Sequence, residues 1–138
     1  MAHTENTYNG WTNYETWRLN LELFDGWDIM STWSEDEWLE TMRSEYETIN
    51  QAHRTAIDAE TKASFFSIYM SAWLADYLKS YPEMMIEESK EDCKILTGWM
   101  ESFLDHVNFR EIADHHLMED KMYMSALEQI KNGAEVLK

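Results

Sequence analysis

The sequence predicts an all-α protein: a single compact domain, residues 1–138, of about five to six helices around a central apolar helix. Gly and Pro, the residues that most often interrupt helices, occur four times and once. No alternation of apolar and polar residues is long enough to indicate a strand. With 44% hydrophobic residues the chain can build a core, and folding at this length buries roughly two-thirds of the unfolded surface. We find no linker or internal repeat that would divide the chain.

The first helix is expected inside the aromatic stretch NGWTNYETW and the residues that follow it. Thr12 with Glu15 fits a capping box, in which the Thr oxygen accepts the amide three residues on, and Asn13 is the alternative cap. Gly26 is expected to end the helix, and Trp17 is expected to pack against the central helix. The apolar residues at helical spacing are Tyr14, Trp17, Leu21 and Phe24.

Caps mark the starts of the next two helices. Ser34 with Glu37 fits a second capping box, and the acids of its first turn favour the helix dipole. The apolar stripe of this helix is Trp38, Met42, Tyr46 and Ile49. Thr55 with Asp58 is expected to open a third helix that runs to about Lys79. Its stretch KASFFSIYMSAWLADYL is apolar nearly all round, which predicts the central, most buried helix.

The remaining helices follow the proline. Pro82 in SYPEM is expected to break the central helix and to occupy the first turn of the next one. Asn108 with Glu111 is expected to cap a short fifth helix, FREIADHHLME. A sixth helix is expected to be interrupted near Gly133. The apolar stripe of the fourth helix is Ile95, Leu96, Trp99, Met100, Phe103, Leu104 and Val107, and that of the sixth is Met124, Leu127 and Ile130.

The chain is strongly acidic, with 27 Asp and Glu against 11 Lys and Arg and a net charge of −16. Proteins bind nucleic acid and anionic lipid largely through Lys and Arg, so we expect neither direct nucleic-acid binding nor membrane binding. The charge favours basic protein surfaces or cations as partners and speeds encounter with them. The alternative is that the acidity serves solubility alone.

The acidic residues are clustered along the chain. Residues 35–60 carry eight acids and two bases, residues 83–92 five and one, and residues 101–120 six and one. Carboxylates on successive turns of a helix lie about 5–6 Å apart, a spacing that can imitate a row of phosphates. The predicted partner-binding acidic face consists of Glu35, Asp36, Glu37, Glu40, Glu87, Glu88, Glu91 and Asp92.

The sequence favours a cytoplasmic protein. Cys93 has no second cysteine to pair with, which is typical of a reducing compartment. The opening MAHTENTYNG has neither a basic region nor an apolar stretch of the kind that forms a secretory signal. No apolar run approaches the roughly 18 residues that a membrane span requires.

Catalytic and metal-binding patterns are weak. Glu111, His115 and Glu119 share a helix face at a spacing that metal sites use, but no HExxH motif or second Cys/His cluster accompanies them. Cys93 lies between acids and lysines in KEDCKIL, with no motif that marks a nucleophile. No glycine-rich phosphate loop is present. We therefore expect neither an enzyme nor a cofactor or metal.

The stretch YNGWTNYETWRLNLELFDG resembles the opening of a family of small proteins carried by phages, plasmids and their prokaryotic hosts, which reads approximately NGW-x-NYETW. A second segment, VNFREIADHHL at residues 107–117, is similar to a recurrent V-[DN]-[WF]-R-E-I-A stretch in such proteins. Together the segments cover about 30 of the 138 residues. The resemblance implies a mobile-element origin and, by analogy with other small acidic proteins of such elements, an inhibitor of host defence of the anti-restriction or anti-CRISPR type.

The aromatic opening has two interpretations. In the structural one, Asn9-Gly10 forms a turn because both residues tolerate positive φ, and Trp11 packs on the first helical turn as a hydrophobic staple. In the functional one, Trp11 and Tyr14 form an exposed aromatic anchor for a partner, since Trp and Tyr dominate the residues that carry binding energy at interfaces.

Two function hypotheses follow. The first is a non-enzymatic acidic binding protein of a mobile genetic element, which inhibits a nucleic-acid-binding host defence complex by nucleic-acid mimicry. Its partner is a basic nucleic-acid-binding protein or complex in the host cytoplasm. The alternative is a structural or regulatory interaction module whose aromatic N-terminus mediates docking or self-association, a hypothesis compatible with a homodimer.

Overall fold

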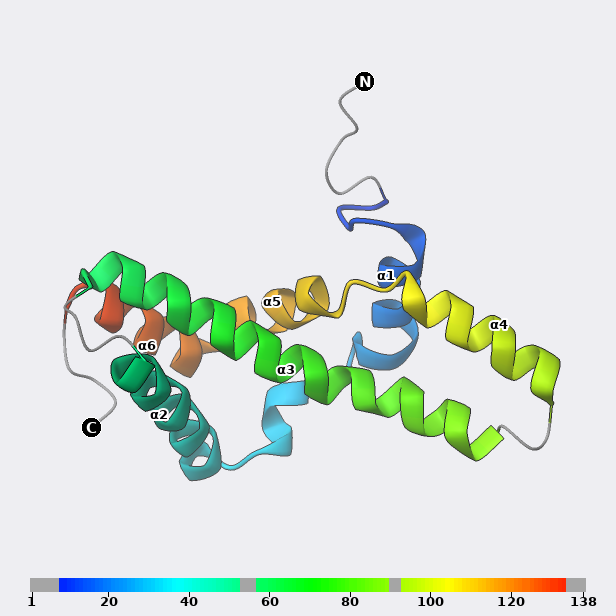
Figure 1. Ribbon diagram of the computed structural model, residues 1–138, viewed down its shortest axis with the longest axis horizontal. Helices are drawn as coiled ribbons and strands as arrows, with labels where there is room; N and C mark the ends of the chain where they lie inside the picture. Colours follow the sequence, from blue (N-terminus) through cyan, green and yellow to red (C-terminus); the bar gives the residue numbers. More distant parts are fainter. Residues whose placement is uncertain (1–7, 53–56, 90–92, 134–138) are drawn as a thin grey trace, which may run out of the picture. The chain divides into compact units, whose positions relative to one another are not determined.

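The computed structural model of the protein describes residues 8–52, 57–89 and 93–133 (Figure 1). In this part of the chain the regular structure is helical, and the extended backbone pairs only at an isolated bridge between Tyr8 and Trp11. The all-α fold class is therefore confirmed. The elements are α1 (Tyr14–Leu19), the π-helix η1 (Asn20–Phe24), the 3₁₀-helix η2 (Ile29–Thr32), α2 (Glu35–Ala52), α3 (Ala59–Ser89), α4 (Lys94–Asp105), α5 (Phe109–Glu119) and α6 (Lys121–Lys131).

Contacts within the chain group these elements into two compact units. Unit 1 comprises residues 1–27 and 74–113, and unit 2 comprises residues 28–73 and 114–138. Helix α3 contributes its first half to unit 2 and its second half to unit 1. Among the helices that the structure describes, none is both long enough and apolar enough to cross a membrane. The organisation of residues 1–138 as a single domain stays a prediction.

The apolar helix α3 supplies fully buried side chains to both units. In unit 2 these include Phe66 and Met70, and in unit 1 they include Leu74 and Leu78, each with no exposed surface. Asp58 caps the helix, because its Oδ1 accepts a hydrogen bond from the Thr61 amide at 2.7 Å. The expected cap, Thr55, lies outside the described residues, but Ile57 and Asp58 are not helical, so α3 begins later than the sequence predicts. The prediction of a central apolar helix is confirmed.

The expected break at Pro82 is wrong, because α3 continues through the proline to Ser89. A proline inside a helix removes one backbone hydrogen bond and costs about 3 kcal/mol. In unit 1 that cost is opposed by burial: Leu78, Pro82 and Ile86 are all buried at i, i+4 spacing, and burying a large apolar side chain contributes about 1.5–3 kcal/mol. Tyr81 directly precedes the proline: its hydroxyl lies 2.7 Å from that of Tyr77, and its ring packs edge-on against Trp27.

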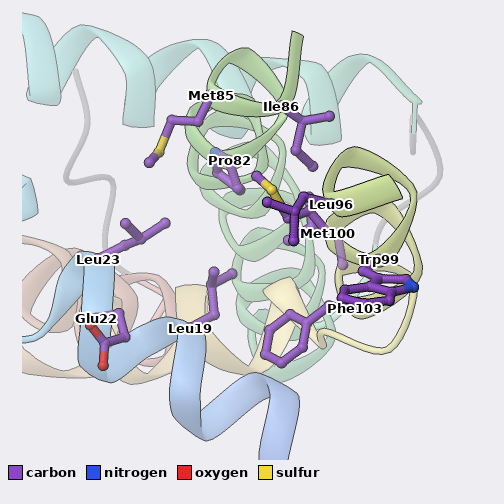
Figure 2. A pocket seen from close by; sticks show the side chains of 11 residues that line it. Leu19, Glu22, Leu23, Pro82, Met85, Ile86, Leu96, Trp99, Met100 and Phe103 are labelled. Atoms are coloured by element: carbon purple, nitrogen blue, oxygen red, sulfur yellow. The ribbon is translucent and has the colours of Figure 1, made fainter. Parts of the chain in front are cut away.

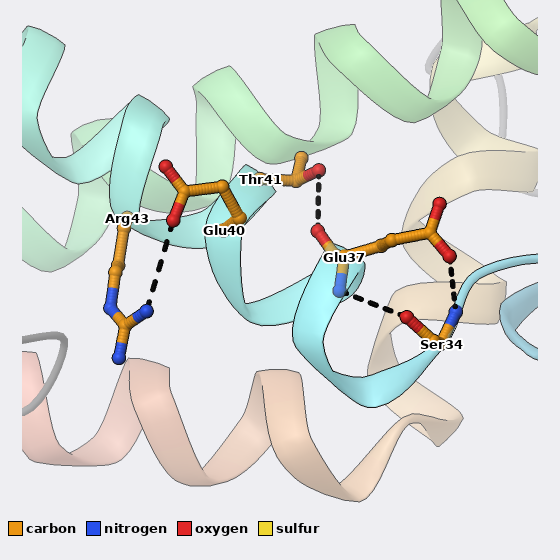
Figure 3. A network of polar contacts seen from close by, with 5 residues as sticks. All are labelled: Ser34, Glu37, Glu40, Thr41 and Arg43. Carbon is orange, nitrogen blue, oxygen red and sulfur yellow. Dashed lines mark hydrogen bonds and ion pairs between the residues drawn. The ribbon is translucent and has the colours of Figure 1, made fainter.

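In unit 2, helix α2 begins as the sequence predicts. The Ser34 amide donates to Glu37 Oε1 at 3.2 Å, and the Glu37 amide donates to Ser34 Oγ at 3.2 Å, which completes the capping box (Figure 3). The predicted apolar stripe is buried at Trp38, Met42 and Ile49.

A shared carboxylate joins α2 to the start of α6. The Trp38 indole donates to Asp120 Oδ2 at 2.8 Å, and the same oxygen caps α6 by accepting the Tyr123 amide at 2.8 Å. The buried face of α6 is Tyr123, Ala126 and Ile130. The expected stripe is therefore shifted by one residue at its start, where Met124 is exposed and the Tyr123 ring stacks on Phe66 instead.

In unit 1, the inner face of the first helix differs from the expected one. Tyr14 and Leu21 are each 41% exposed, whereas Thr16, Leu19 and Asn20 are buried. From Asn20 onward the helix is the π-helical turn η1, in which the Asp25 amide reaches back five residues to the Asn20 carbonyl at 2.7 Å. A π-turn inserts one extra residue per turn and rotates the face that follows it. Phe24, the last residue of the π-turn, is fully buried, and Gly26 at φ 81° ends the segment as predicted.

Gly98 and Gly26 provide a matched pair for a stability prediction. A methyl group added to either glycine would meet no atom within 4 Å, but Gly98 lies inside α4, whereas Gly26 has φ 81°. Gly98→Ala should raise the free energy of unfolding by about 0.5–1 kcal/mol, because it lowers the entropy of the unfolded chain. Gly26→Ala should lower it by about 1–2 kcal/mol, because alanine disfavours positive φ. Urea unfolding measures both changes, and equal signs would contradict the prediction.

The cap at Asp58 predicts a pH dependence. Hydrogen bonds from Thr61 lower the pKa of the Asp58 carboxyl below its usual value. A lowered folded-state pKa stabilises the protein above the unfolded-state pKa, and this contribution is lost as the pH falls through the folded-state value. Asp58→Ala should therefore be less stable than the parent at pH 7, and the difference should shrink in acid. Thermal unfolding across this pH range measures it, and a difference that grows in acid would contradict the assignment.

Candidate protein-interaction site

The opening of the described chain is a tight turn. The Tyr8 amide donates to the Trp11 carbonyl at 2.9 Å, and the Trp11 amide donates to the Tyr8 carbonyl at 2.7 Å. Between them Asn9 and Gly10 have φ of 50° and 88°. Positive φ at both central positions is the geometry that Asn-Gly favours. The predicted turn at Asn9-Gly10 is therefore confirmed.

Asn13, and not Thr12, caps α1. Asn13 Oδ1 accepts the Thr16 amide at 2.9 Å and the Thr16 hydroxyl at 2.7 Å. The Thr12 amide instead donates to the carboxylate of Glu111, at 3.0 and 3.2 Å. The expected Thr12–Glu15 capping box is wrong, since the asparagine side chain reaches the N3 amide one residue later in the chain.

The same cap ties α1 to the start of α5. Asn13 Nδ2 donates to the His106 carbonyl at 2.7 Å, and the Asn108 amide donates to Thr16 Oγ1 at 2.8 Å. Asn108 in turn caps α5 as predicted, accepting the Glu111 amide at 3.1 Å. We call these contacts, with the Thr12–Glu111 bond, the N-terminal junction. It joins the two segments, NGWTNYETW and VNFREIADHHL, on which the family resemblance rests.

Aromatic rings cover the outer side of the junction. Tyr8 lies 5.1 Å from both Tyr14 and Trp17, measured between ring centroids, and Tyr14 lies 6.5 Å from Phe103 of α4. Trp17 is half-buried in this cluster, and its expected packing against the central helix stays a prediction. Of the two residues of the expected aromatic anchor, Tyr14 is 41% exposed and Trp11 is half-buried.

Unit 1 also contains an open apolar groove of about 400 Å³, which shares Phe103 with this cluster (Figure 2). Its walls come from three elements: the end of α1 with η1, the second half of α3, and α4. Glu22 is the one charged residue of the lining, and it pairs with Arg18 at 2.7 Å. The lining residues are Leu19, Glu22, Leu23, Pro82, Met85, Ile86, Leu96, Trp99, Met100, Phe103 and Leu104. We call this the apolar groove.

The predicted α4 stripe faces this groove and is not buried in a core. Trp99 is 67% exposed and Leu96 52% exposed, and the buried residue of α4 is Thr97. On the opposite wall Met85 is 50% exposed. The helical spacing of the predicted stripe is therefore correct, and the structure adds that much of the stripe is exposed. On this α3 wall the sequence carried a signal of exposure, because Met84 and Met85, which are both exposed, lie within the acidic run of residues 83–92.

The predicted acidic residues lie in different parts of the fold. Glu35, Asp36, Glu37 and Glu40 are all exposed on the first turns of α2 in unit 2. Glu40 Oε2 lies 3.8 Å from Arg43 Nη1 (Figure 3). Glu87 and Glu88 are exposed near the end of α3 in unit 1. The last two predicted residues, Glu91 and Asp92, lie outside the described residues.

The residues considered for catalysis or metal binding make other contacts or lie apart from one another. The Glu111 carboxylate belongs to the N-terminal junction, while His115 Nε2 lies 3.4 Å from Glu119 Oε1. Within residues 8–52, 57–89 and 93–133, no three His, Cys, Asp or Glu side chains gather closely enough to hold a metal ion. Cys93 is half-buried just before α4.

No protein-family model, curated protein or solved structure matches the chain. The resemblance of NGWTNYETW to proteins of mobile elements stays a prediction. The functional argument therefore proceeds from the exposed carboxylates of α2 and from the apolar groove.

Substitutions of Thr16 test the contribution of the N-terminal junction to stability. Thr16→Val keeps the shape of this fully buried side chain but removes the acceptor of the Asn108 amide. An unsatisfied buried group costs about 1–3 kcal/mol, so the free energy of unfolding should fall by that amount. Amide hydrogen exchange at Asn108 should also become faster. Thr16→Ser retains the hydroxyl and should leave the Asn108 amide protected, and equal exchange in the two variants would contradict the assignment.

Proposed function

We propose that this protein is a non-enzymatic acidic binding protein that occupies the nucleic-acid-binding groove of a basic host protein by mimicking phosphates. The observation that carries the proposal is a row of exposed carboxylates on α2. Asp36, Glu40 and Glu47 are exposed, and helical periodicity places them within about 40° of one another around the axis. The resemblance of the opening segment adds the expectation that the target belongs to a host defence complex.

The row is held on a fixed support. On the opposite face of α2, Trp38, Met42 and Ile49 are buried in unit 2, and the Trp38 indole is hydrogen-bonded to Asp120. Side chains presented by a packed helix lose less entropy on binding than those of a mobile loop. At 1.5 Å per residue, the row from residue 36 to residue 47 extends over about 16 Å.

The charged side chains in and around this part of α2 are acidic, with the exception of Arg43. Glu35 and Glu37 flank the row at the start of the helix, and Arg43 lies within it, close to Glu40. Exposed pairs of this kind contribute about 0–1 kcal/mol, so a guanidinium 3.8 Å from Glu40 leaves the carboxylate available to a partner. A basic groove that normally neutralises phosphates would gain similar contacts with these carboxylates.

A second candidate function uses the aromatic N-terminus as a docking surface. It is favoured by Tyr8 and Tyr14, which are 37% and 41% exposed within one ring cluster. In that case binding or self-association would depend on rings and not on charge. Trp11→Ala would then disrupt the assembly, and high salt would have little effect on it.

Charge reversal tests mimicry. The tagged protein is used to capture partners from prokaryotic host lysate at about 50 mM and about 200 mM salt, and the captured proteins are then challenged with duplex DNA. Affinity should fall steeply over this range, as it does when proteins bind phosphates, and DNA should displace the protein from its partner. Asp36→Lys/Glu40→Lys should weaken capture about tenfold, since each exposed charge pair contributes roughly 0.2–1 kcal/mol.

The matched control is Asp76→Lys/Glu128→Lys, which changes the net charge equally at two exposed positions inside other helices. Circular dichroism checks that both double variants fold. If the two lose affinity equally, net charge alone is responsible and the α2 row is not the contact. Partners that bind this protein and DNA simultaneously would contradict mimicry.

A further inference from the structure

The apolar groove offers exposed apolar surface, which phosphate mimicry by the carboxylates of α2 does not use. Its exposed side chains are large and apolar: Trp99, Leu96, Met85 and Met100 range from 37% to 67% exposed. Figure 2 shows Met85 of α3 and Leu96 and Met100 of α4 around one space, with Leu19 and Leu23 on its other side and Trp99 at its outer edge. Contiguous exposed apolar surface of this kind marks an interaction site in soluble proteins.

The shape of the groove suits a helix. Leu96, Met100 and Phe103 repeat along α4 at the spacing of successive turns, and residues 96–104 extend over about 12 Å at 1.5 Å per residue. An amphipathic helix lays side chains at i, i+3 or i+4 and i+7 into such a groove, which takes two to three turns. Met85 and Met100 add adaptable surface, since methionine can repack around side chains of different shape.

Charge decides which helix fits. The described residues of unit 1 carry more than twice as many acids as bases, and three of the acids, Glu83, Glu87 and Glu88, are exposed on the α3 segment that lines the groove. A second copy of this chain would bring its own net charge of −16 to the contact. Like charges brought together at an interface cost several kcal/mol. A helix with an apolar face and Lys or Arg beside it gains attraction instead.

We propose that the apolar groove binds a basic amphipathic helix of a partner protein, with apolar side chains of that helix seated between Met85 of α3 and Trp99 of α4. The site is independent of the carboxylates of α2, which lie in unit 2. The protein thus carries two surfaces for basic partners, one that acts through charge alone and one that acts through apolar burial guided by charge.

A pair of synthetic helices tests the proposal. Both are 18-residue peptides with Leu at helical i, i+3, i+4 and i+7 positions, and the other positions carry Lys in one peptide and Glu in its twin. Fluorescence anisotropy of the labelled peptides should show saturable binding of the Lys peptide, with the Glu peptide at least about tenfold weaker. Binding of the Lys peptide should persist at about 0.5 M salt, where the Debye length is only a few Å, because burial of Leu is not screened.

Two groove variants and a matched control locate the site. Met85→Lys and Trp99→Ser should each weaken binding of the Lys peptide about tenfold or more, as loss of a central apolar anchor does. Met118→Lys makes the same change as Met85→Lys at a 67% exposed methionine on α5 in unit 2, and it should retain parental affinity. Circular dichroism of the full chain verifies that each variant is folded.

Three outcomes would overturn the proposal. The first is equal binding of the two peptides, and the second is an equal loss of peptide affinity in Met85→Lys and Met118→Lys. The third is a protein that does not bind the peptide but forms a concentration-dependent dimer in sedimentation, which Met85→Lys abolishes. The last would identify the groove as a self-association surface. Asp36→Lys/Glu40→Lys should leave peptide binding unchanged. Failure of mimicry by α2 and failure of helix binding by the groove are therefore separate results.

Discussion

The hydrogen bonds of the N-terminal junction are the constraint on which unit 1 depends. One asparagine side chain, Asn13, caps α1 with its oxygen and holds the His106 carbonyl with its nitrogen. The buried Thr16 hydroxyl then accepts the Asn108 amide at the start of α5. Because α4 ends immediately before this point, the junction fixes α1 and η1 relative to α4. Two of the three walls of the apolar groove are therefore positioned by polar contacts that lie outside it.

Two departures from regular helix geometry adjoin the same groove. The π-turn η1 follows Leu19, and Pro82 lies inside α3, and both Leu19 and Pro82 line the groove. π-turns and interior prolines carry an energetic cost, and natural proteins retain such features most often at functional sites. Here that cost is opposed by the burial of Phe24 at the end of the π-turn and of Leu78 and Ile86 around the proline. This concentration of irregular backbone agrees with a binding role for the groove.

The two proposed surfaces would bind basic partners by different interactions, one through charge and the other through apolar burial. On α2 the carboxylates stand on a helix that is packed through Trp38 and capped by Ser34 and Glu37, so the charges are presented without an apolar surface beside them. In unit 1 the apolar groove offers burial, and the surrounding acids select against acidic partners. The acidic residues that are proposed to bind partners also give the protein its net charge of −16, and such a charge favours solubility.

The sequence by itself determined the all-α class, the caps at Ser34 and Asn108 and the Asn9-Gly10 turn, because these depend on residues a few positions apart. It also located the acidic residues of α2, whose exposure follows from their charge. Only the tertiary structure decided that α3 continues through Pro82 and that the apolar stripe of α4 remains exposed. The physical reason is that both depend on burial by residues distant in sequence. An apolar stripe has the same spacing whether a core covers it or a partner does, and only packing distinguishes the two.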